Sequence, residues 1–311
     1  MIDPKLRVLQ LVAHHGTVTA AAQALHYTPS AVSHQLRQLA ADLDVELVVQ
    51  SGRGIRLTAA AATVLRHTEI LQAQVERARA ELATTTDDTN GSFTLCGFST
   101  AAMHLLPPAA AALRDQHSNL TVRVIEAEPS RCFDLLLAGD ADLALLIATA
   151  ETPPGSDTRF DQRPLLDDPL DLVVPDGHRL TTQRTVTLAD AADESWIVGR
   201  PGSTYHHLVL TACMAAGFTP NIAHYADEWD TGTALVAHGF GIILVPRLAR
   251  LHEGWPVTRL PLHGEPAPAR RILAATRLGS REHPAVTTAL NTITSTAGSL
   301  LPSPRPGGRK E

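Results

Sequence analysis

A polar stripe between residues 30 and 37 carries side chains suited to molecular recognition. At i, i+3, i+4 and i+7 on one helix face stand Ser30, Ser33, His34 and Arg37. They are hydrogen-bond donors or small groups, and no acid interrupts them. Such side chains can reach the edges of nucleic-acid bases. Taken alone, the solvated face of an ordinary amphipathic helix explains the stripe equally well.

The helix that carries this stripe also needs a cap and a buried face. Thr28 can cap it, and Pro29 suits its first position, where the missing N–H costs nothing. A second stripe, at i, i+4, i+7 and i+11, should face a core. It consists of Val32, Leu36, Leu39 and Leu43.

Two shorter helices should precede this one. Leu6, Leu9 and Ala13 recur at helical spacing, and Gly16 should end that helix. Thr19 is the expected cap of a second helix over residues 20–25. A three-residue turn then completes a helix-turn-helix, which places its second helix in the major groove of DNA. This context favours base recognition over a merely solvated face.

Two strand-like runs follow, separated by a glycine-rich turn. Residues 45–49 and 55–57 predict a hairpin with Arg53 at its tip. An exposed arginine there suits a phosphate or a narrow minor groove. A lone loop arginine is usually only solvated, so Arg53 is informative only together with the helix.

A long helix should follow, capped by Thr58 and running to about Thr84. Its heptad seam consists of Ala61, Val64, Thr68, Leu71, Val75, Ala78 and Leu82. Because a single exposed helix of this length needs a partner for its apolar stripe, we expect dimerisation. The residues expected to mediate it are Val64, Leu71, Val75 and Leu82. The alternative is packing of the helix against its own chain.

The remainder of the chain alternates between strands and helices, after a polar hinge over residues 84–91. A first unit reads βαβαβ, with strands at 93–98, 120–126 and 141–147 and helices at 101–116 and 129–138. Pro107 and Pro108 should break the first of these helices. A second unit has strands at 170–174, 196–198 and 241–245 and helices at 205–216 and 231–238. The pattern predicts an α/β fold with a mostly parallel sheet.

Hydroxyl groups follow predicted strands at the edge where open α/β sheets bind ligands. Ser99 and Thr100 open one helix, and Gly202, Ser203 and Thr204 open another. Such helix starts can hold an anion, so we expect a carboxylate-bearing ligand. For these residues alone, plain helix capping is the favoured alternative. Further candidates are Glu128, which would suit a donor group of the ligand, Thr231, and Trp229, which could be core or pocket wall.

The motifs argue against catalysis and against a metal site. The sequence contains no GxSxG, HExxH, P-loop or GxGxxG motif, so we predict a protein that is not an enzyme and uses no cofactor. The adjacent pairs His14–His15 and His206–His207 should diverge on their helices rather than share a metal ion. The three cysteines stand far apart and fit a reducing cytosol.

The charge is unevenly distributed along the 311 residues, which have a net charge of −6. Residues 1–86 hold eight Lys and Arg against seven Asp and Glu, so only this part could approach phosphates without general repulsion. No apolar run reaches the roughly 18 residues that span a bilayer. We therefore expect a cytoplasmic protein without a membrane partner.

Five segments resemble the LysR-type transcriptional regulators, in the order typical of that family. The strongest is AAQALHYTPSAVSHQLRQLAADLDVEL followed by GRGIRLT, and the others are GDADLALLI, LLDDPLDLVVPDGHRL, VTLADAADESWI and ALVAHGFGIILVP. The resemblance implies an N-terminal winged helix-turn-helix over residues 1–58 and a linker helix with hinge over 59–90. It also implies a two-subdomain, periplasmic-binding-protein-like α/β effector-binding domain over 91–297. A proline- and glycine-rich tail over 298–311 should be disordered.

The resemblance further implies a regulator that binds promoter DNA as a homodimer or homotetramer. It would sense a small-molecule effector in a cleft between the subdomains and contact RNA polymerase. The DNA-binding candidates are then Thr28, Pro29, Ser30, Ser33, His34, Arg37 and Arg53. A stand-alone small-molecule binding protein is the alternative, because the fold of residues 91–297 would allow it.

Two positions depart from the family pattern. His34 stands where the family often has arginine, and Val48-Val49-Gln50 stands where it often has Phe-x-Arg. Because a neutral histidine makes one hydrogen bond rather than two, we expect a different base sequence to be read. The missing arginine at Gln50 predicts a weaker salt dependence of DNA binding.

Overall fold

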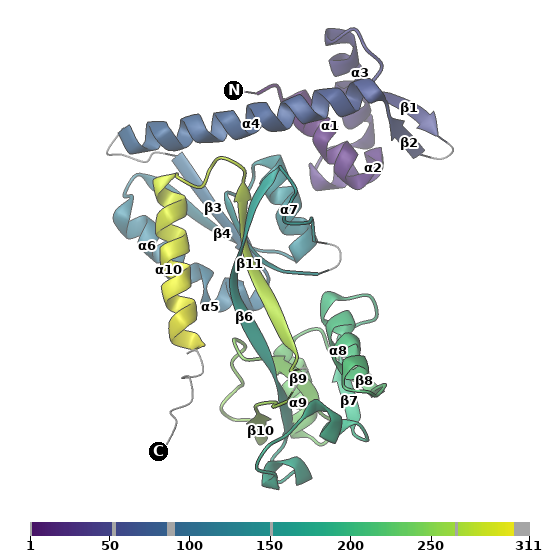
Figure 1. Cartoon of the computed structure of the whole chain (residues 1–311), viewed down its shortest axis with the longest axis vertical. Helices are drawn as coiled ribbons and strands as arrows, with labels where there is room; N and C mark the ends of the chain where they lie inside the picture. The colour runs from purple at the N-terminus through teal and green to yellow at the C-terminus, as the bar shows by residue number, and fades with distance from the viewer. Residues whose placement is uncertain (1, 52–53, 86–90, 150–151, 265–266, 302–311) are drawn as a thin grey trace. The chain divides into compact units, whose positions relative to one another are not determined.

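The computed structural model describes residues 2–51, 54–85, 91–149, 152–264 and 267–301 (Figure 1). They form two compact units. Unit 1 comprises the described residues within 1–165 and 273–298, and unit 2 comprises those within 166–272 and 299–301. No helix in the described ranges is long and apolar enough to cross a membrane.

Unit 1 begins with three helices and a hairpin. These are α1 (Pro4–His15), α2 (Val18–Ala24), α3 (Pro29–Asp42), β1 (Val48–Ser51) and β2 (Gly54–Leu57). Gly16 ends α1 as predicted, in the left-handed conformation at φ 68°. The predicted cap of α2 is wrong: Thr17, not Thr19, accepts the hydrogen bond from Ala20 N at 3.2 Å. Thr17 is the residue with extended backbone, so its side chain can turn back onto the free N–H groups.

The buried face of α3 ends one turn earlier than predicted. Val32, Leu36 and Leu39 are buried in the core that α1 and α2 also line. Leu43 is 44% exposed. It is the C-cap of α3, and the chain leaves helical geometry at Asp44, whose φ is 51°, so the helical spacing no longer applies.

Helix α4 (Ala59–Thr85) buries one face within unit 1, including Ala61 and Thr68 of the predicted seam, and leaves other seam residues exposed. Thr58 Oγ1 caps it by accepting a hydrogen bond from Ala61 N at 3.1 Å. The face buried in unit 1 consists of Ala61, Thr68, Ala73, Glu76 and Ala80. Helix α4 packs closely against the backbone at Gly279. A side chain at that position would not fit, because its Cβ would lie 2.2 Å from the carbonyl oxygen of Ala73. Leu71 and Leu82 of the seam remain 55% and 62% exposed.

The α/β part of unit 1 is built around parallel strands. Strand β3 (Gly91–Gly97) pairs with β4 (Leu120–Glu126) on one side and β5 (Leu143–Ile147) on the other. The helices are α5 (Ser99–His104), α6 (Leu106–Gln116), α7 (Pro129–Ala138) and α10 (Pro284–Leu300). The expected break before Pro107 and Pro108 lies at Leu105, and both prolines fall in the first turn of α6.

The predicted tail begins too early. Residues 298–300 form the last turn of α10, because Ala289, Ile293 and Ala297 continue a buried i, i+4 stripe up to that end. Residues 302–311 lie outside the described residues.

Unit 2 is less parallel than the sequence predicted. Strand β6 (Phe160–Pro175), which starts in unit 1, pairs antiparallel with β9 (Ile243–Pro246) and with β10 (Val257–Leu260). Strands β7 (Ser195–Val198) and β8 (Asn221–Tyr225) form a separate parallel pair. Helices α8 (Thr204–Ala215) and α9 (Trp229–Ala237) complete the unit, and β11 (Ala269–Arg277) returns the chain to unit 1.

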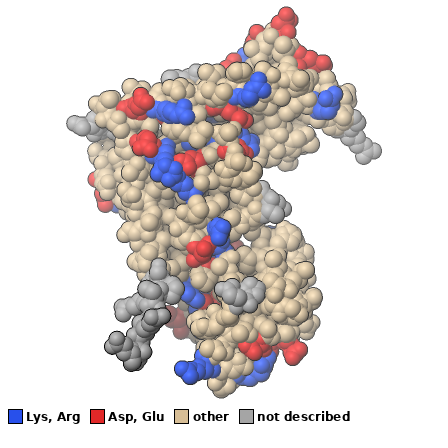
Figure 2. Space-filling view, in the orientation of Figure 1, with Lys and Arg blue, Asp and Glu red and all other residues tan. Residues whose placement is uncertain are grey.

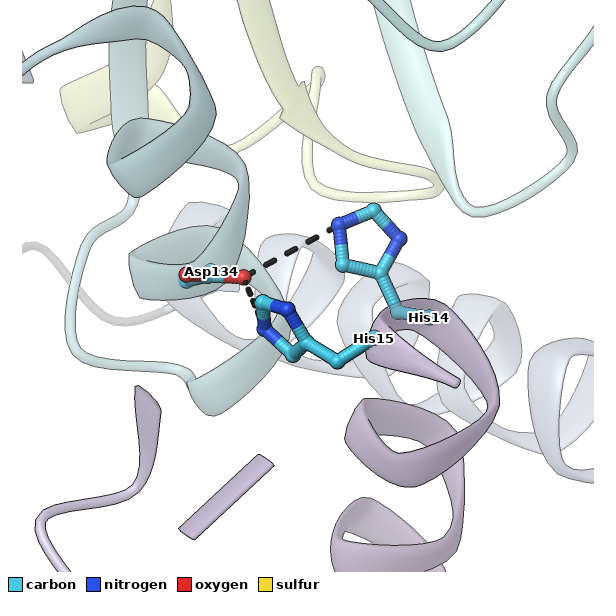
Figure 3. Close-up of side chains that lie close together, drawn as sticks. All are labelled: His14, His15 and Asp134. Atoms are coloured by element: carbon cyan, nitrogen blue, oxygen red, sulfur yellow. Dashed lines mark ion pairs between the residues drawn. The ribbon is translucent and has the colours of Figure 1, made fainter. Parts of the chain in front are cut away.

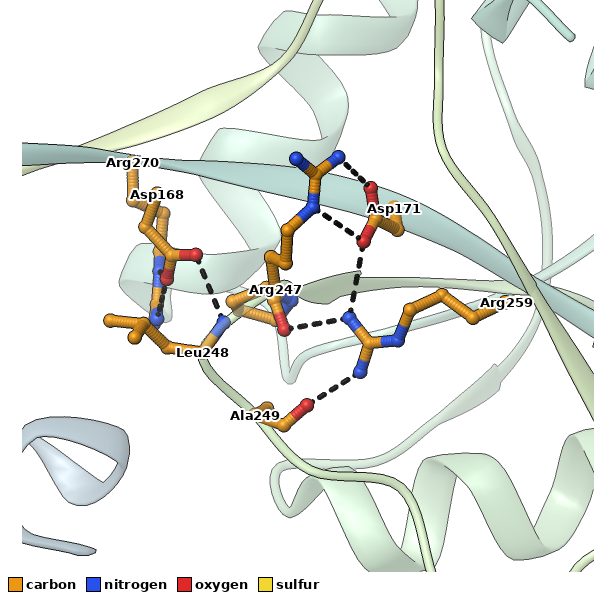
Figure 4. A network of polar contacts seen from close by, with 8 residues as sticks. Asp168, Asp171, Arg247, Leu248, Ala249, Arg259 and Arg270 are labelled. Carbon is orange, nitrogen blue, oxygen red and sulfur yellow. Dashed lines mark hydrogen bonds and ion pairs between the residues drawn. The ribbon is translucent and has the colours of Figure 1, made fainter. Parts of the chain in front are cut away.

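A network of buried ion pairs fixes the segment after β9 (Figure 4). Asp168 accepts hydrogen bonds from Arg270 and from Leu248 N, the latter at 3.1 Å. Asp171 pairs with Arg247 at 2.6 Å and with Arg259 at 3.3 Å. Both acids lie on β6, and the other buried side chains of this strand are apolar. Each buried carboxylate is therefore compensated by guanidinium groups from another part of unit 2.

Candidate functional site

The stripe on α3 is accessible to a partner. Ser30, His34 and Arg37 are exposed and Ser33 is half-buried, on the side of the helix away from Val32 and Leu36. The N-terminus of α3 is fixed by Thr28, whose Oγ1 accepts a hydrogen bond from Ala31 N at 3.2 Å. Pro29 and Thr28 are exposed beside the stripe.

The visible face of the molecule has mixed charge. Over the face drawn in Figure 2, basic and acidic side chains are interspersed rather than gathered into one basic field. A phosphate that approached this face would therefore meet individual charges and not a broad positive potential. Arg53, the predicted contact at the hairpin tip, lies outside the described residues.

The predicted effector residues of unit 1 differ in accessibility. Ser99 is half-buried at the first position of α5, and Thr100 is buried. Glu128 is exposed at the N-cap of α7, where its side chain makes no capping hydrogen bond. Among these three residues, Ser99 and Glu128 therefore offer polar atoms to a ligand.

In unit 2 the serine of the predicted anion site also works as a cap. Ser203 Oγ accepts a hydrogen bond from His206 N at 3.1 Å, and Gly202 precedes it with φ 85°. Thr204 is half-buried in the first turn of α8. The capping role expected as the alternative thus applies to Ser203, although its hydroxyl proton stays available to a ligand.

Trp229 packs against other side chains of unit 2 but remains partly accessible to a ligand. It is half-buried at the start of α9 and packs edge-on against Tyr205, with ring centroids 4.6 Å apart. Thr231, two residues later, is exposed. Tyr205 is itself anchored by a hydrogen bond from its hydroxyl to the carbonyl of Leu244, and burial raises the pKa of that hydroxyl.

A histidine–aspartate cluster in unit 1 was missed by the sequence analysis (Figure 3). Nε2 of His15 lies 2.8 Å from Oδ1 of Asp134, and Nε2 of His14 lies 3.8 Å from the same oxygen. The expectation that these histidines diverge is therefore wrong. They occupy the last two positions of α1, where both rings can turn toward α7, and they approach each other to 5.0 Å between centroids. Burial lowers the pKa of His14.

Arg131 joins the same two parts of unit 1. It lies on α7 and donates a hydrogen bond to the carbonyl of Ala24 at 2.8 Å, and its other terminal nitrogen lies 2.9 Å from His26 Nε2. Helix α7 therefore contacts both α1 and α2. The acid of this cluster, Asp134, comes from α7 and lies far from the two histidines in the sequence. The adjacent histidines by themselves resemble the pair His206–His207, so the local sequence does not identify the cluster.

Two segments of the chain match known families. Residues 4–62 match the bacterial regulatory helix-turn-helix protein of the lysR family, and residues 86–298 match the LysR substrate binding domain. The chain belongs to the LysR family. It is a DNA-binding transcriptional regulator with an effector-binding domain, and not an enzyme.

Similar curated proteins support this membership in the LysR family. A probable hydrogen peroxide-inducible genes activator of Mycobacterium avium is 30% identical over 270 residues, covering 86% of this chain and 85% of that protein. The regulator AlsR of Bacillus subtilis is 29% identical, covering 74% of this chain and 75% of that protein.

Solved LysR-family structures share the fold. A full-length OxyR variant from Pseudomonas aeruginosa covers 94% of both chains with a TM-score of 0.62 at 20% identity. Full-length BenM covers 96% of this chain and 97% of its own, with a TM-score of 0.58 at 21% identity. The predicted architecture is confirmed: a helix-turn-helix domain, a long helix and an α/β domain.

Proposed function

We propose that this regulator reads promoter DNA through α3, as a homodimer or homotetramer. The observation that carries the proposal is the exposure of Ser30, His34 and Arg37 opposite the buried face of α3. The proposed DNA-binding set is completed by Thr28, Pro29, Ser33 and Arg53. In this proposal the protein acts in the cytoplasm, contacts RNA polymerase when bound to the promoter, and keeps the domain division 1–58, 59–90 and 91–297.

Fluorescence anisotropy with a labelled duplex from upstream of the protein's own coding region tests DNA reading. His34→Ala and Arg37→Ala should each weaken binding about tenfold, because each removes a base or phosphate contact. Arg123→Ala is the control, since Arg123 is an exposed arginine on β4. Wild-type affinity in both stripe variants at low salt would remove α3 from the interface.

We propose that the effector is a small metabolite bearing a carboxylate. Ser99 and Ser203 support this, because each offers a hydroxyl near the first turn of a helix that follows a strand. Glu128 would accept a hydrogen bond from a donor group of the same ligand. The remaining proposed contacts are Thr100, Gly202, Thr204, Trp229 and Thr231.

Tryptophan fluorescence can test the effector proposal with acetate, succinate and benzoate as probes. A binding carboxylate should change the emission of the wild type, and the change should be lost in Trp229→Phe. Ser99→Ala and Ser203→Ala should weaken binding about tenfold, since each removes a hydrogen bond to a charged group. Ser92→Ala, an exposed position on β3, is the control. Unchanged binding in both serine variants would exclude these residues.

Two relatives are named as hydrogen peroxide-inducible genes activators, so an oxidant is a second candidate for the signal that this regulator senses. The thiols of this chain argue against it. Cys96, Cys132 and Cys213 are all buried. A hydrogen bond with Cys132 and burial raise the pKa of Cys96, and burial raises the pKa of Cys213 to about 12. Since the thiolate is the reactive form, we propose that a metabolite rather than an oxidant is sensed.

A further inference from the structure

Three side chains from α1 and α7 converge in unit 1 in a way that hydrogen bonding does not explain. One ligand-type atom each from His14, His15 and Asp134 lies within 4.8 Å of the others. Asp134 is on α7, and its side chain is only 10% exposed. His15 Nε2 and Asp134 Oδ1 are both buried and form an ion pair at 2.8 Å (Figure 3), but among the described residues neither atom has a partner aligned for a hydrogen bond. Buried polar atoms without a partner are rare and call for an explanation.

We propose that His14, His15 and Asp134 bind a divalent transition-metal ion of the zinc type. Two imidazole nitrogens and one carboxylate oxygen are ligands that zinc prefers, each at about 2.0–2.2 Å. Ligand atoms held at that radius are separated by roughly 3–3.5 Å. The observed separations of 2.8 and 3.8 Å from Asp134 Oδ1 bracket this range. An ion between them would coordinate both atoms, which their ion pair leaves without an aligned hydrogen bond.

The ligand types also select among metals. Magnesium and calcium prefer oxygen ligands, so a site with two imidazoles disfavours them. Zinc and its neighbours cobalt, nickel and copper accept imidazole readily. Three protein ligands leave a fourth position for water, so the site would accept a tetrahedral ion.

Neighbouring cations are compensated and leave the acid available. Arg131 lies 3.8 Å from Asp134 Oδ2, the oxygen opposite to the one that faces the histidines, and its hydrogen bonds go to Ala24 and His26. Arg159, whose charge also reaches His14, is held by Asp157 through two contacts of 2.9 and 2.6 Å. In the part of the chain that the structure describes, the ion pairs of Asp134 Oδ1 are those with the two histidines.

A metal ion here would join the helix-turn-helix to the α/β part of unit 1. His14 and His15 end α1, and Asp134 lies in the middle of α7. Binding would add to the contacts that Arg131 already makes with α2. Metal occupancy would thereby stabilise the contact of α1 with α7, independently of the DNA and effector proposals.

Isothermal titration of chelator-treated, full-length protein with zinc chloride tests the proposal. We expect one ion per chain and a loss of affinity of at least about tenfold in each of His14→Gln, His15→Gln and Asp134→Asn, because even residues behind a ligand contribute that much. The variant His206→Gln/His207→Gln is the matched control, since it removes an adjacent histidine pair outside the cluster. It should bind zinc like the wild type.

Cobalt provides a second readout that does not depend on a variant folding. Wild-type protein with cobalt chloride should show visible absorption of a nitrogen- and oxygen-ligated ion, without the sulfur charge-transfer band that cysteine ligands would give. An overturning result is absence of zinc and cobalt binding by the wild type, or equal binding by a folded Asp134→Asn variant. Either outcome would leave a simple ion pair between His15 and Asp134. Because no DNA is present, these outcomes are separate from those of the DNA-binding test.

Discussion

His283 caps α10 with a side chain that must stay neutral. Its Nδ1 accepts a hydrogen bond from Ala285 N at 3.2 Å, so that nitrogen cannot carry a proton. Burial lowers the pKa of His283 from its ordinary value of 6.5. Below about pH 6.5 the unfolded chain therefore binds more protons at this position than the folded chain does. Stability should fall as the pH decreases from 7 to 5.

The variant His283→Asn should flatten this pH dependence. Asparagine keeps a capping oxygen but does not titrate, so folding would no longer exclude a proton at this position. Urea unfolding of the wild type and the variant at pH 7 and pH 5 measures the difference. His263→Asn is the control, because His263 is exposed. An equal loss of stability in wild type and His283→Asn would contradict the assignment.

The cysteines lead to a second prediction for single residues. Because their thiols are buried and raised pKa values disfavour the thiolate of Cys96 and Cys213, they should resist modification. Native protein treated with hydrogen peroxide or a thiol reagent at pH 7 should retain free thiols by mass spectrometry. Urea-unfolded protein should react at all three. Rapid formation of a disulfide in the native protein would restore the oxidant as a candidate signal.

Two neighbouring acids on β6 allow the stability contribution of a buried ion pair to be compared with that of an exposed one. Asp168 and Arg270 are almost fully buried, whereas the pair Asp167–Arg271 is more than 60% exposed on both sides. Removing one partner of a buried pair leaves an uncompensated charge and costs about 3–5 kcal/mol. Asp168→Asn should therefore lower the free energy of unfolding by about 3 kcal/mol, measured by urea denaturation. Asp167→Asn, the matched control, should change it by less than about 1 kcal/mol. Similar losses in both variants would contradict this account.

The hairpin of β1 and β2 permits a test of the predicted weak salt dependence of DNA binding. Gln50 is exposed on β1, where the family often has arginine. Gln50→Arg should add one phosphate contact and make the slope of log affinity against log salt steeper by about 0.9. Gln74→Arg adds the same charge at an exposed position of α4 and should leave the slope near that of the wild type. A wild-type slope typical of about ten phosphate contacts would refute the prediction.

At the scale of the whole molecule, the exposed seam of α4 predicts self-association. Leu71 and Leu82 are exposed, and Val64 and Val75 beside them are half-buried, while another face of α4 packs within unit 1. Leu71→Asp/Leu82→Asp should convert an oligomer into monomers in multi-angle light scattering, because buried charges oppose helix pairing. Thr63→Asp, an exposed position outside the seam, should leave the mass unchanged. A monomeric wild type, or an oligomeric double variant, would remove the seam from the interface.

Local sequence patterns determined most elements and the family. The cap at Thr28, the stop at Gly16, the break before Pro107 and the alternation of strands and helices depend on neighbours a few residues away. Such features are encoded in spacing and in the conformational preferences of threonine, glycine and proline. The polar stripe on α3 is of the same kind, because helical periodicity alone fixes which side chains share a face.

Tertiary contacts decided the features that spacing cannot encode. Helical periodicity predicted one apolar seam on α4. Contacts with Gly279 and the rest of unit 1 bury a different set of residues, which shares only Ala61 and Thr68 with that seam. The strands β8, β10 and β11 escaped prediction because strands with mixed burial depend on their partners. The histidine–aspartate cluster has the same origin. Its acid comes from α7 and its histidines from α1, so only the folded chain brings these three side chains together.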